Sequence, residues 1–130
     1  VSISLPELEM MHIHKTGALI RAAVALGARC AGGLSPADLE RLDSYAKCVG
    51  LAFQVVDDIL DAEGTTESLG KTAGKDAAQN KPTYVTLMGA APAKEFAARL
   101  RADAHAAIAP FGERGLRLAQ LADFIVLRKF

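Results

Sequence analysis

The sequence contains no tryptophan, and aromatic residues make up only 5% of its 130 positions. Because β-strands favour aromatic and β-branched side chains, this shortage argues against a protein built on a sheet. Apolar residues still make up 51% of the chain, and many of them are alanine, a strong helix former. The length suits one domain. We therefore predict an all-α fold in which amphipathic helices pack into a bundle.

The chain also lacks net charge, because 15 basic residues balance 15 acidic ones. Without a basic excess, neither a nucleic acid nor an anionic membrane surface is predicted as a partner. The two cysteines, Cys30 and Cys48, show no spacing typical of a disulfide framework or a zinc site. We therefore expect a reduced, cytoplasmic setting. No stretch of 18 residues is free of charge, so no membrane span is predicted either.

An acidic turn follows a strongly apolar run in residues 53–61, FQVVDDILD. In a helix, Asp57 and Asp61 lie one above the other, with roughly 5–6 Å between their Cβ atoms. Asp58 is rotated about 100° from Asp57 and reaches the pair only from the side. Mg²⁺ binds oxygen ligands and commonly takes one or two carboxylates together with substrate phosphates. The pattern indicates a magnesium site, with an acidic turn on a surface helix as the alternative.

Four segments together resemble one enzyme family. Residues 50–61 (GLAFQVVDDILD) resemble the second aspartate-rich motif of the trans-type polyprenyl diphosphate synthases, with bacterial farnesyl diphosphate synthases as the nearest match. Residues 14–19 (HKTGAL), 69–76 (LGKTAGKD) and 81–84 (KPTY) look like the family's Lys-Thr element, phosphate loop and K-x-T-Y element, in the same order. The resemblance extends nearly from end to end and implies a helical bundle of the isoprenoid synthase type.

The resemblance also implies a reaction. A synthase of this kind condenses an allylic diphosphate, such as dimethylallyl or geranyl diphosphate, with isopentenyl diphosphate to give farnesyl diphosphate or a similar product. Mg²⁺ assists ionisation of the allylic diphosphate, and cations stabilise the departing pyrophosphate. By resemblance, the metal ligands are Asp57, Asp58 and Asp61, and the catalytic cations are Lys15, Lys71 and Lys81.

Four further residues acquire roles from the same resemblance. Thr16 and Gln54 would lie beside the allylic cation, where their oxygen dipoles stabilise positive charge. Phe53 would line the substrate one helical turn before Asp57, and Lys75 would contribute a second cation to the phosphate loop. Glycines in that loop allow backbone N–H groups to approach an anion, which lysines then neutralise.

The resemblance covers only the C-terminal half of the family. The other half carries the first aspartate-rich motif, and residues 57–61 form the only D-D-x-x-D here. We therefore interpret residues 1–130 as the C-terminal part of a single polyprenyl synthase domain, which the family leads us to expect as a homodimer. Two alternatives stay open: a noncatalytic regulatory or assembly subunit of the same lineage, and a class I terpene cyclase.

Capping residues and apolar periodicity predict about six helices. The first helix begins at Pro6, the second covers 17–30 with Thr16 as its cap, and the third runs from Pro36, with Ser35 as its cap, to the acidic turn. A loop is predicted over 62–81. The remaining helices cover 82–88, 91–109 and 116–128. The stripe predicted to face inward on the second helix is Leu19, Ala22, Ala23, Leu26 and Cys30. Arg128 and Lys129 lie at the C-terminal end of the last helix, where positive charge interacts favourably with the helix dipole. A less favoured alternative is that this basic chain end closes over a phosphate.

Overall fold

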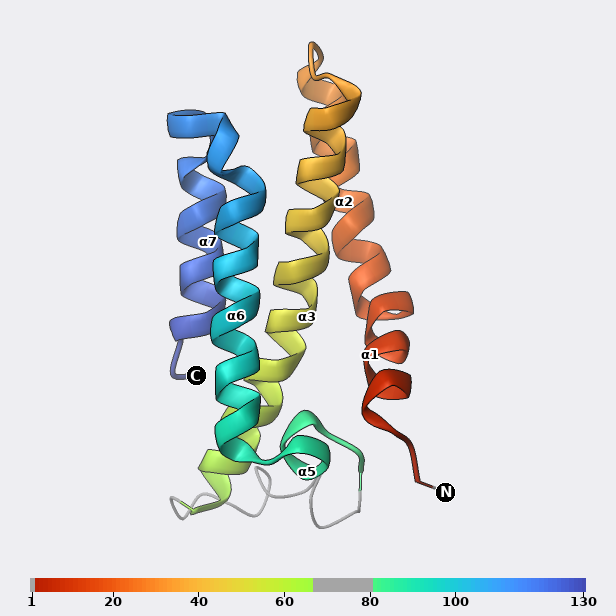
Figure 1. Ribbon diagram of the computed structural model, residues 1–130, viewed down its shortest axis with the longest axis vertical. Coiled ribbons are helices and arrows are strands. Elements are labelled where there is room, and N and C mark those ends of the chain that lie inside the picture. Colours follow the sequence, from red (N-terminus) through yellow and green to blue (C-terminus); the bar gives the residue numbers. More distant parts are fainter. Residues whose placement is uncertain (1, 67–80) are drawn as a thin grey trace.

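The structure is a computed structural model that describes residues 2–66 and 81–130, and this part of the chain is helical with no strand. Its elements are α1 (Leu5–His14), α2 (Thr16–Ala31), α3 (Pro36–Thr66), α5 (Tyr84–Met88), α6 (Ala90–Ile108), the 3₁₀ helix η1 (Ala109–Gly115) and α7 (Leu116–Leu127). Figure 1 shows α3 between α1 and α2 on one side and α6 and α7 on the other. The predicted all-α bundle is therefore confirmed.

The central helix α3 begins where the sequence predicts. The backbone N–H of Asp38 donates to Ser35 Oγ at 3.1 Å, and the N–H of Ser35 donates to Asp38 Oδ2 at 3.1 Å. The other end differs from the prediction, because α3 continues to Thr66. Residues 62–66 are thus helical, and the loop predicted over 62–81 begins too early. Glu63 supports this extension through an ion pair with Lys94 of α6, 2.6 Å long.

The break between α1 and α2 falls at Lys15. This residue has φ −94° and ψ −80° and occupies the cap position of α2, and no side chain caps the helix there. The predicted Thr16 cap is therefore wrong, because Thr16 is already the first residue of α2. A Cβ atom on Gly17 would lie 3.2 Å from the carbonyl oxygen of His12, so a larger residue would crowd the break between the two helices.

Helix α2 turns a different face to the core than predicted. Leu19 and Leu26, from the expected inward stripe, are 75% and 65% exposed, whereas Ala28 is buried. Arg21 forms two hydrogen bonds to the Asp43 carboxylate of α3, at 2.8 and 3.0 Å. Both faces of α2 carry apolar residues, and this clamp helps set which of them meets α3.

The core forms two clusters along α3. One lies between α1, α3, α5 and α6 and contains the fully buried Leu8, Val55 and Tyr84. The other lies between α3, α6 and α7, where the Tyr45 hydroxyl donates to the carbonyl of Leu118 at 2.7 Å. The apolar spacing of residues 116–128 also predicts that Leu121 faces inward, but this residue is 47% exposed. None of the helices in residues 2–66 and 81–130 is both long and apolar enough to cross a membrane.

Candidate functional site

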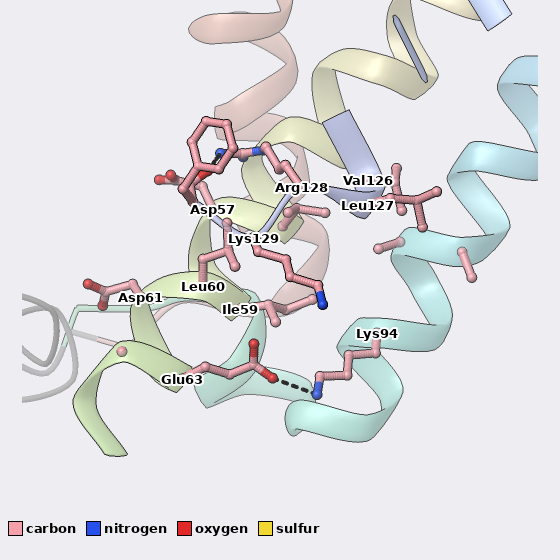
Figure 2. A pocket seen from close by; sticks show the side chains of 15 residues that line it. Asp57, Ile59, Leu60, Asp61, Glu63, Lys94, Val126, Leu127, Arg128 and Lys129 are labelled. Atoms are coloured by element: carbon pink, nitrogen blue, oxygen red, sulfur yellow. Dashed lines mark hydrogen bonds and ion pairs between the residues drawn. The ribbon is translucent and has the colours of Figure 1, made fainter. Parts of the chain in front are cut away.

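The aspartate turn, residues 57–61, lies within α3 and contributes Asp57 and Asp61 to the wall of an open groove of about 1020 Å³. Figure 2 shows this groove between the end of α3, the first turns of α6 and the chain end after α7. Asp57 is exposed and Asp61 is half-buried. Because the two residues are four apart on one helix, their carboxylates lie on the same side of α3. Both residues of the pair predicted from the sequence therefore line one groove.

Cationic side chains from two other elements line the same groove: Lys94 of α6 and Arg128 and Lys129 of the chain end. Lys94 forms the ion pair with Glu63, which Figure 2 shows as a dashed line between α6 and the end of α3. No motif in the sequence marks Lys94 as a site residue. Its place becomes visible only when the start of α6 packs against the end of α3.

Phe53 is in contact with Arg128 of the chain end. The guanidinium of Arg128 lies over its ring, 4.7 Å from the centroid, and Arg128 Nη2 donates to the Phe53 carbonyl at 3.3 Å. Arg128 also donates from Nε to the Ile125 carbonyl at 3.1 Å. It thus holds the chain end beside α3, one turn before the aspartate turn. Phe53 itself is 39% exposed, and its predicted contact with substrate stays a prediction.

Asp58 is directed to a different place from its two neighbours. Its Oδ2 accepts a hydrogen bond from the backbone N–H of Tyr84, the first residue of α5, at 2.9 Å. Among the described residues, no three His, Cys, Asp or Glu side chains lie close enough together to hold a metal ion. Three carboxylates line the groove, and one of them, Glu63, is paired with Lys94; the two from the aspartate turn are Asp57 and Asp61. Such a pair suits a magnesium ion that takes its remaining ligands from phosphate oxygens and water.

Tyr84 is fully buried where α1, α3 and α5 meet. Its hydroxyl shares a hydrogen bond of 3.1 Å with His12 Nδ1, and its ring packs against His12 and Phe96 at centroid distances of 5.3 and 6.0 Å. Burial raises the pKa of Tyr84, and the charges of Glu9 and Asp58 raise it further. The pKa of His12 is lowered, mainly by burial and then by the charge of Lys15.

The Lys-Thr element lies at the α1–α2 break and reaches α3 close to the aspartate turn. Lys15 is exposed and Thr16 is half-buried. A Cβ atom on Gly50 of α3 would lie 3.6 Å from the Cα atom of Gly17, so the break touches α3 one turn before Gln54. Gln54, half-buried, precedes the aspartate turn by one further turn. The Lys-Thr element therefore contacts α3 about two turns before the aspartates.

The K-x-T-Y element forms the start of α5. Thr83 and Thr86 form a capping box at the start of this helix. The backbone N–H of Thr86 donates to Thr83 Oγ1 at 3.0 Å, and the backbone N–H of Thr83 donates to Thr86 Oγ1 at 2.8 Å. Lys81 is exposed and precedes this cap by two residues. Lys71 and Lys75 of the predicted phosphate loop lie outside the described residues.

The sequence pattern of the polyprenyl synthetase family matches residues 1–107 of this chain. The chain belongs to the polyprenyl synthetase family. The resemblance drawn from four motifs is thereby confirmed.

Relatives within and beyond bacteria agree with this assignment. Over 126 residues the chain is 50% identical to "Geranylgeranyl pyrophosphate synthase 10, mitochondrial" of Arabidopsis thaliana, covering 96% of this chain and 36% of that protein. It is 51% identical over 122 residues to "Probable farnesyl diphosphate synthase" of Bradyrhizobium diazoefficiens, covering 92% of this chain and 37% of the relative. The chain therefore spans little more than a third of these relatives.

A solved structure supports the same fold. The crystal structure of a "putative farnesyl-diphosphate synthase" from Marinomonas sp. MED121 superimposes with a TM-score of 0.79 at 44% sequence identity. The match covers 96% of this chain and 41% of the solved one. The helical arrangement of Figure 1 is thus that of a segment of a polyprenyl synthetase family structure.

Proposed function

We propose that this chain supplies the second aspartate-rich motif of a short-chain polyprenyl diphosphate synthase. The enzyme would condense dimethylallyl or geranyl diphosphate with isopentenyl diphosphate to give farnesyl diphosphate or a similar product. The observation that carries the proposal is the placement of Asp57 and Asp61 on one groove wall of α3, in a chain of this family. The names of the relatives as synthases support this function over a regulatory subunit or a terpene cyclase.

The metal proposed for this site is Mg²⁺. The donor set fits it, because Asp57 and Asp61 offer hard carboxylate oxygens one turn apart and leave positions for phosphate oxygens. When bound, the ion would neutralise the diphosphate and make pyrophosphate a better leaving group. Asp58 is proposed as a third acidic residue of this motif, which acts beside the pair while it holds the start of α5.

The lysines would stabilise the charge that develops on the departing pyrophosphate. Lys15 at the α1–α2 break and Lys81 before α5 supply two such charges, and Lys71 and Lys75 are proposed to add to them from the phosphate loop. Preorganised charges of this kind contribute most where the transition state gains its negative charge. Thr16 and Gln54 are proposed to lie beside the allylic cation and stabilise its charge, and Phe53 is proposed to contact the substrate.

Residues 1–130 are proposed to form the C-terminal part of one synthase domain whose remainder carries the first aspartate-rich motif. Two further features are proposed on the family resemblance alone: a homodimer and a location in the cytoplasm. Light scattering on the complete enzyme checks the dimer, and fractionation of cells that express it checks the location.

A chimera tests the catalytic proposal. This chain replaces the aligned segment of the Bradyrhizobium relative, to which it is 51% identical over 122 residues. The chimera is incubated with geranyl diphosphate, labelled isopentenyl diphosphate and Mg²⁺, and labelled prenyl products are separated by chain length. We expect product. A folded chimera that forms none, beside an active parent enzyme, contradicts the proposed function.

Variants of the chimera test the roles of the acids. Asp61→Asn removes one carboxylate charge at nearly constant volume and should lower kcat by about two orders of magnitude or more, because metal-ion stabilisation amounts to several kcal/mol. The matched control is Asp103→Asn, an exposed aspartate of α6, which should leave kcat within about twofold. Equal losses in both variants would show that the Asp61 effect is unspecific.

A further inference from the structure

Tyr84 contacts three elements that each carry a part of the candidate site. Its hydroxyl meets His12 of α1 at 3.1 Å, and its backbone N–H donates to Asp58 of α3 at 2.9 Å. It is also the first residue of α5, three positions after Lys81. His12 in turn precedes Lys15 by three positions, which is about one helical turn.

We propose that Tyr84 is a positioning residue, which holds α1, the aspartate turn and the start of α5 in one arrangement so that Lys15, Asp58 and Lys81 keep fixed places around a diphosphate. The part of this inference that concerns the diphosphate rests on the proposed function. The part that concerns the coupling of the three elements rests on the contacts alone.

The hydroxyl group of Tyr84 is the critical atom for this coupling. Tyr84 is fully buried, and buried polar groups in proteins almost always have a hydrogen-bond partner. His12 Nδ1 is such a partner here, and no buried side-chain nitrogen or oxygen among the described residues lacks one. A shift of α1 away from α5 would therefore leave this hydroxyl unsatisfied, so the hydrogen bond favours one position of the α1 end and of Lys15.

A second buried tyrosine provides a matched control. Tyr45 is 1% exposed, and its hydroxyl donates to the Leu118 carbonyl at 2.7 Å. This bond joins α3 to α7. It involves neither the Lys-Thr element at the α1–α2 break nor the start of α5. Tyr45→Phe and Tyr84→Phe therefore remove the same group from similarly buried places, and only the second loss should affect the site.

The first experiment measures hydrogen exchange in the 130-residue chain without any ligand. We expect Tyr84→Phe to speed exchange in residues 12–16 of the α1–α2 break, and His12→Phe to speed exchange in residues 84–88 of α5. The control Tyr45→Phe should change neither segment. If each variant affects only its own helix, or if Tyr45→Phe has the same effect, the coupling is refuted.

The second experiment measures kcat and KM for geranyl diphosphate in the chimera, and calorimetric binding of pyrophosphate with Mg²⁺. Tyr84→Phe should raise KM and the pyrophosphate Kd about three- to tenfold, the range expected from one lost hydrogen bond. Tyr45→Phe should change them less than about twofold, even at an equal loss of thermal stability. Equal changes in the two variants would overturn the positioning role.

Two substitutions of His12 separate the hydrogen bond from packing. His12→Asn keeps a polar atom near the position of Nδ1 and should retain affinity, whereas His12→Phe keeps the ring alone and should weaken binding as Tyr84→Phe does. The double variant His12→Phe/Tyr84→Phe should be no weaker than either single variant, because all three lack the same bond. Additive losses contradict the proposal. If the unsubstituted chimera forms no product, the proposed catalytic function fails, and hydrogen exchange alone still decides the coupling.

Discussion

Asp57 and Asp58 are adjacent in the chain, and α3 turns them toward different surroundings. Asp57 is exposed on the groove, whereas Asp58 accepts the backbone N–H of the buried Tyr84 at 2.9 Å. The helical rotation of about 100° per residue separates two such neighbours. Asp58 is thereby a structural acceptor in addition to its proposed part in the acidic motif.

This difference predicts unequal effects of the same substitution on stability. Asp58→Ala leaves the N–H of Tyr84 without its acceptor and should lower the free energy of unfolding by about 1–3 kcal/mol. Asp57→Ala alters an exposed side chain and should change it by no more than about 0.5 kcal/mol. Urea unfolding of the chain followed by circular dichroism measures both. A loss at Asp57 as large as that at Asp58 would contradict the assignment of Asp58.

Helices α1, α2 and α3 meet at two glycines with different tolerances. A Cβ atom on Gly17 would lie 3.2 Å from the backbone oxygen of His12, which is tighter than most Cβ contacts in proteins and involves a backbone atom. A Cβ atom on Gly50 would meet Ile20 Cδ1 at 3.4 Å and Gly17 Cα at 3.6 Å, which are ordinary contact distances. Close packing therefore explains glycine at 17 more fully than at 50.

We expect Gly17→Ala to destabilise the chain by about 1–3 kcal/mol, as overpacking commonly does. Gly50→Ala should instead be neutral or stabilise it by up to about 1 kcal/mol, because alanine favours the helix more than glycine does. Thermal unfolding of the two variants against the unsubstituted chain provides the test. A stabilising Gly17→Ala would show that the break has room that the structure does not indicate.

Helices α6 and α7 are joined by an acid-sensitive contact. Asp123 Oδ1 accepts from Arg101 Nε at 2.7 Å and lies 2.6 Å from His105 Nε2. Hydrogen bonds from Arg101 and then from His105 hold the pKa of Asp123 below its ordinary value of 3.8. A carboxylate whose pKa is lowered on folding adds stability above its unfolded pKa and loses that contribution as pH falls through the folded one.

Asp123→Asn should therefore lower Tm slightly at pH 6, where the carboxylate of the unsubstituted chain is ionised. The difference in Tm should shrink as pH falls below about 4 and Asp123 takes up a proton. The effect should be small because the three side chains are partly exposed. A difference in Tm that stays constant from pH 6 to pH 2.5 would show that the contact is not electrostatic.

The bundle in its entirety leaves apolar surface on both outer sides. On α2, Leu19 and Leu26 are 75% and 65% exposed, and on α7, Phe124 and Leu127 are 55% and 57% exposed. Contiguous apolar surface on a protein typically marks a place of contact with another protein segment. These faces match the expectation that the remaining part of a synthase, or a second copy, packs against this chain.

For the isolated 130-residue chain we predict self-association or binding of a hydrophobic dye, and no chain elongation on its own. The proposed reaction needs a second set of carboxylates across the cavity, and the chain has one D-D-x-x-D. Light scattering, dye fluorescence and the labelled isopentenyl diphosphate assay measure these properties. Labelled prenyl product from a clean monomer, at a rate proportional to its concentration, would contradict the need for a second motif.

Features that depend on neighbours along the chain could be predicted from the sequence. The Ser35 cap with Asp38 involves residues three apart, and so does the pairing of Thr83 with Thr86 at the start of α5. The positions of Asp57 and Asp61 on one side of a helix follow from its period alone. Family membership, too, was visible in short ordered motifs, because each keeps its residues within a few positions.

Features that depend on which helices pack together could not be predicted. The bond from Tyr84 to Asp58 joins residues 26 apart, and the bond from Tyr84 to His12 joins residues 72 apart. The exposed stripe of α2 and the extension of α3 to Thr66 likewise depend on contacts with other helices. The sequence by itself determined the presence of the helices, the Ser35 cap and the acidic pair. Only tertiary packing decided which of two apolar faces was buried and which distant polar groups became partners, because both depend on contacts between segments that are distant in the chain.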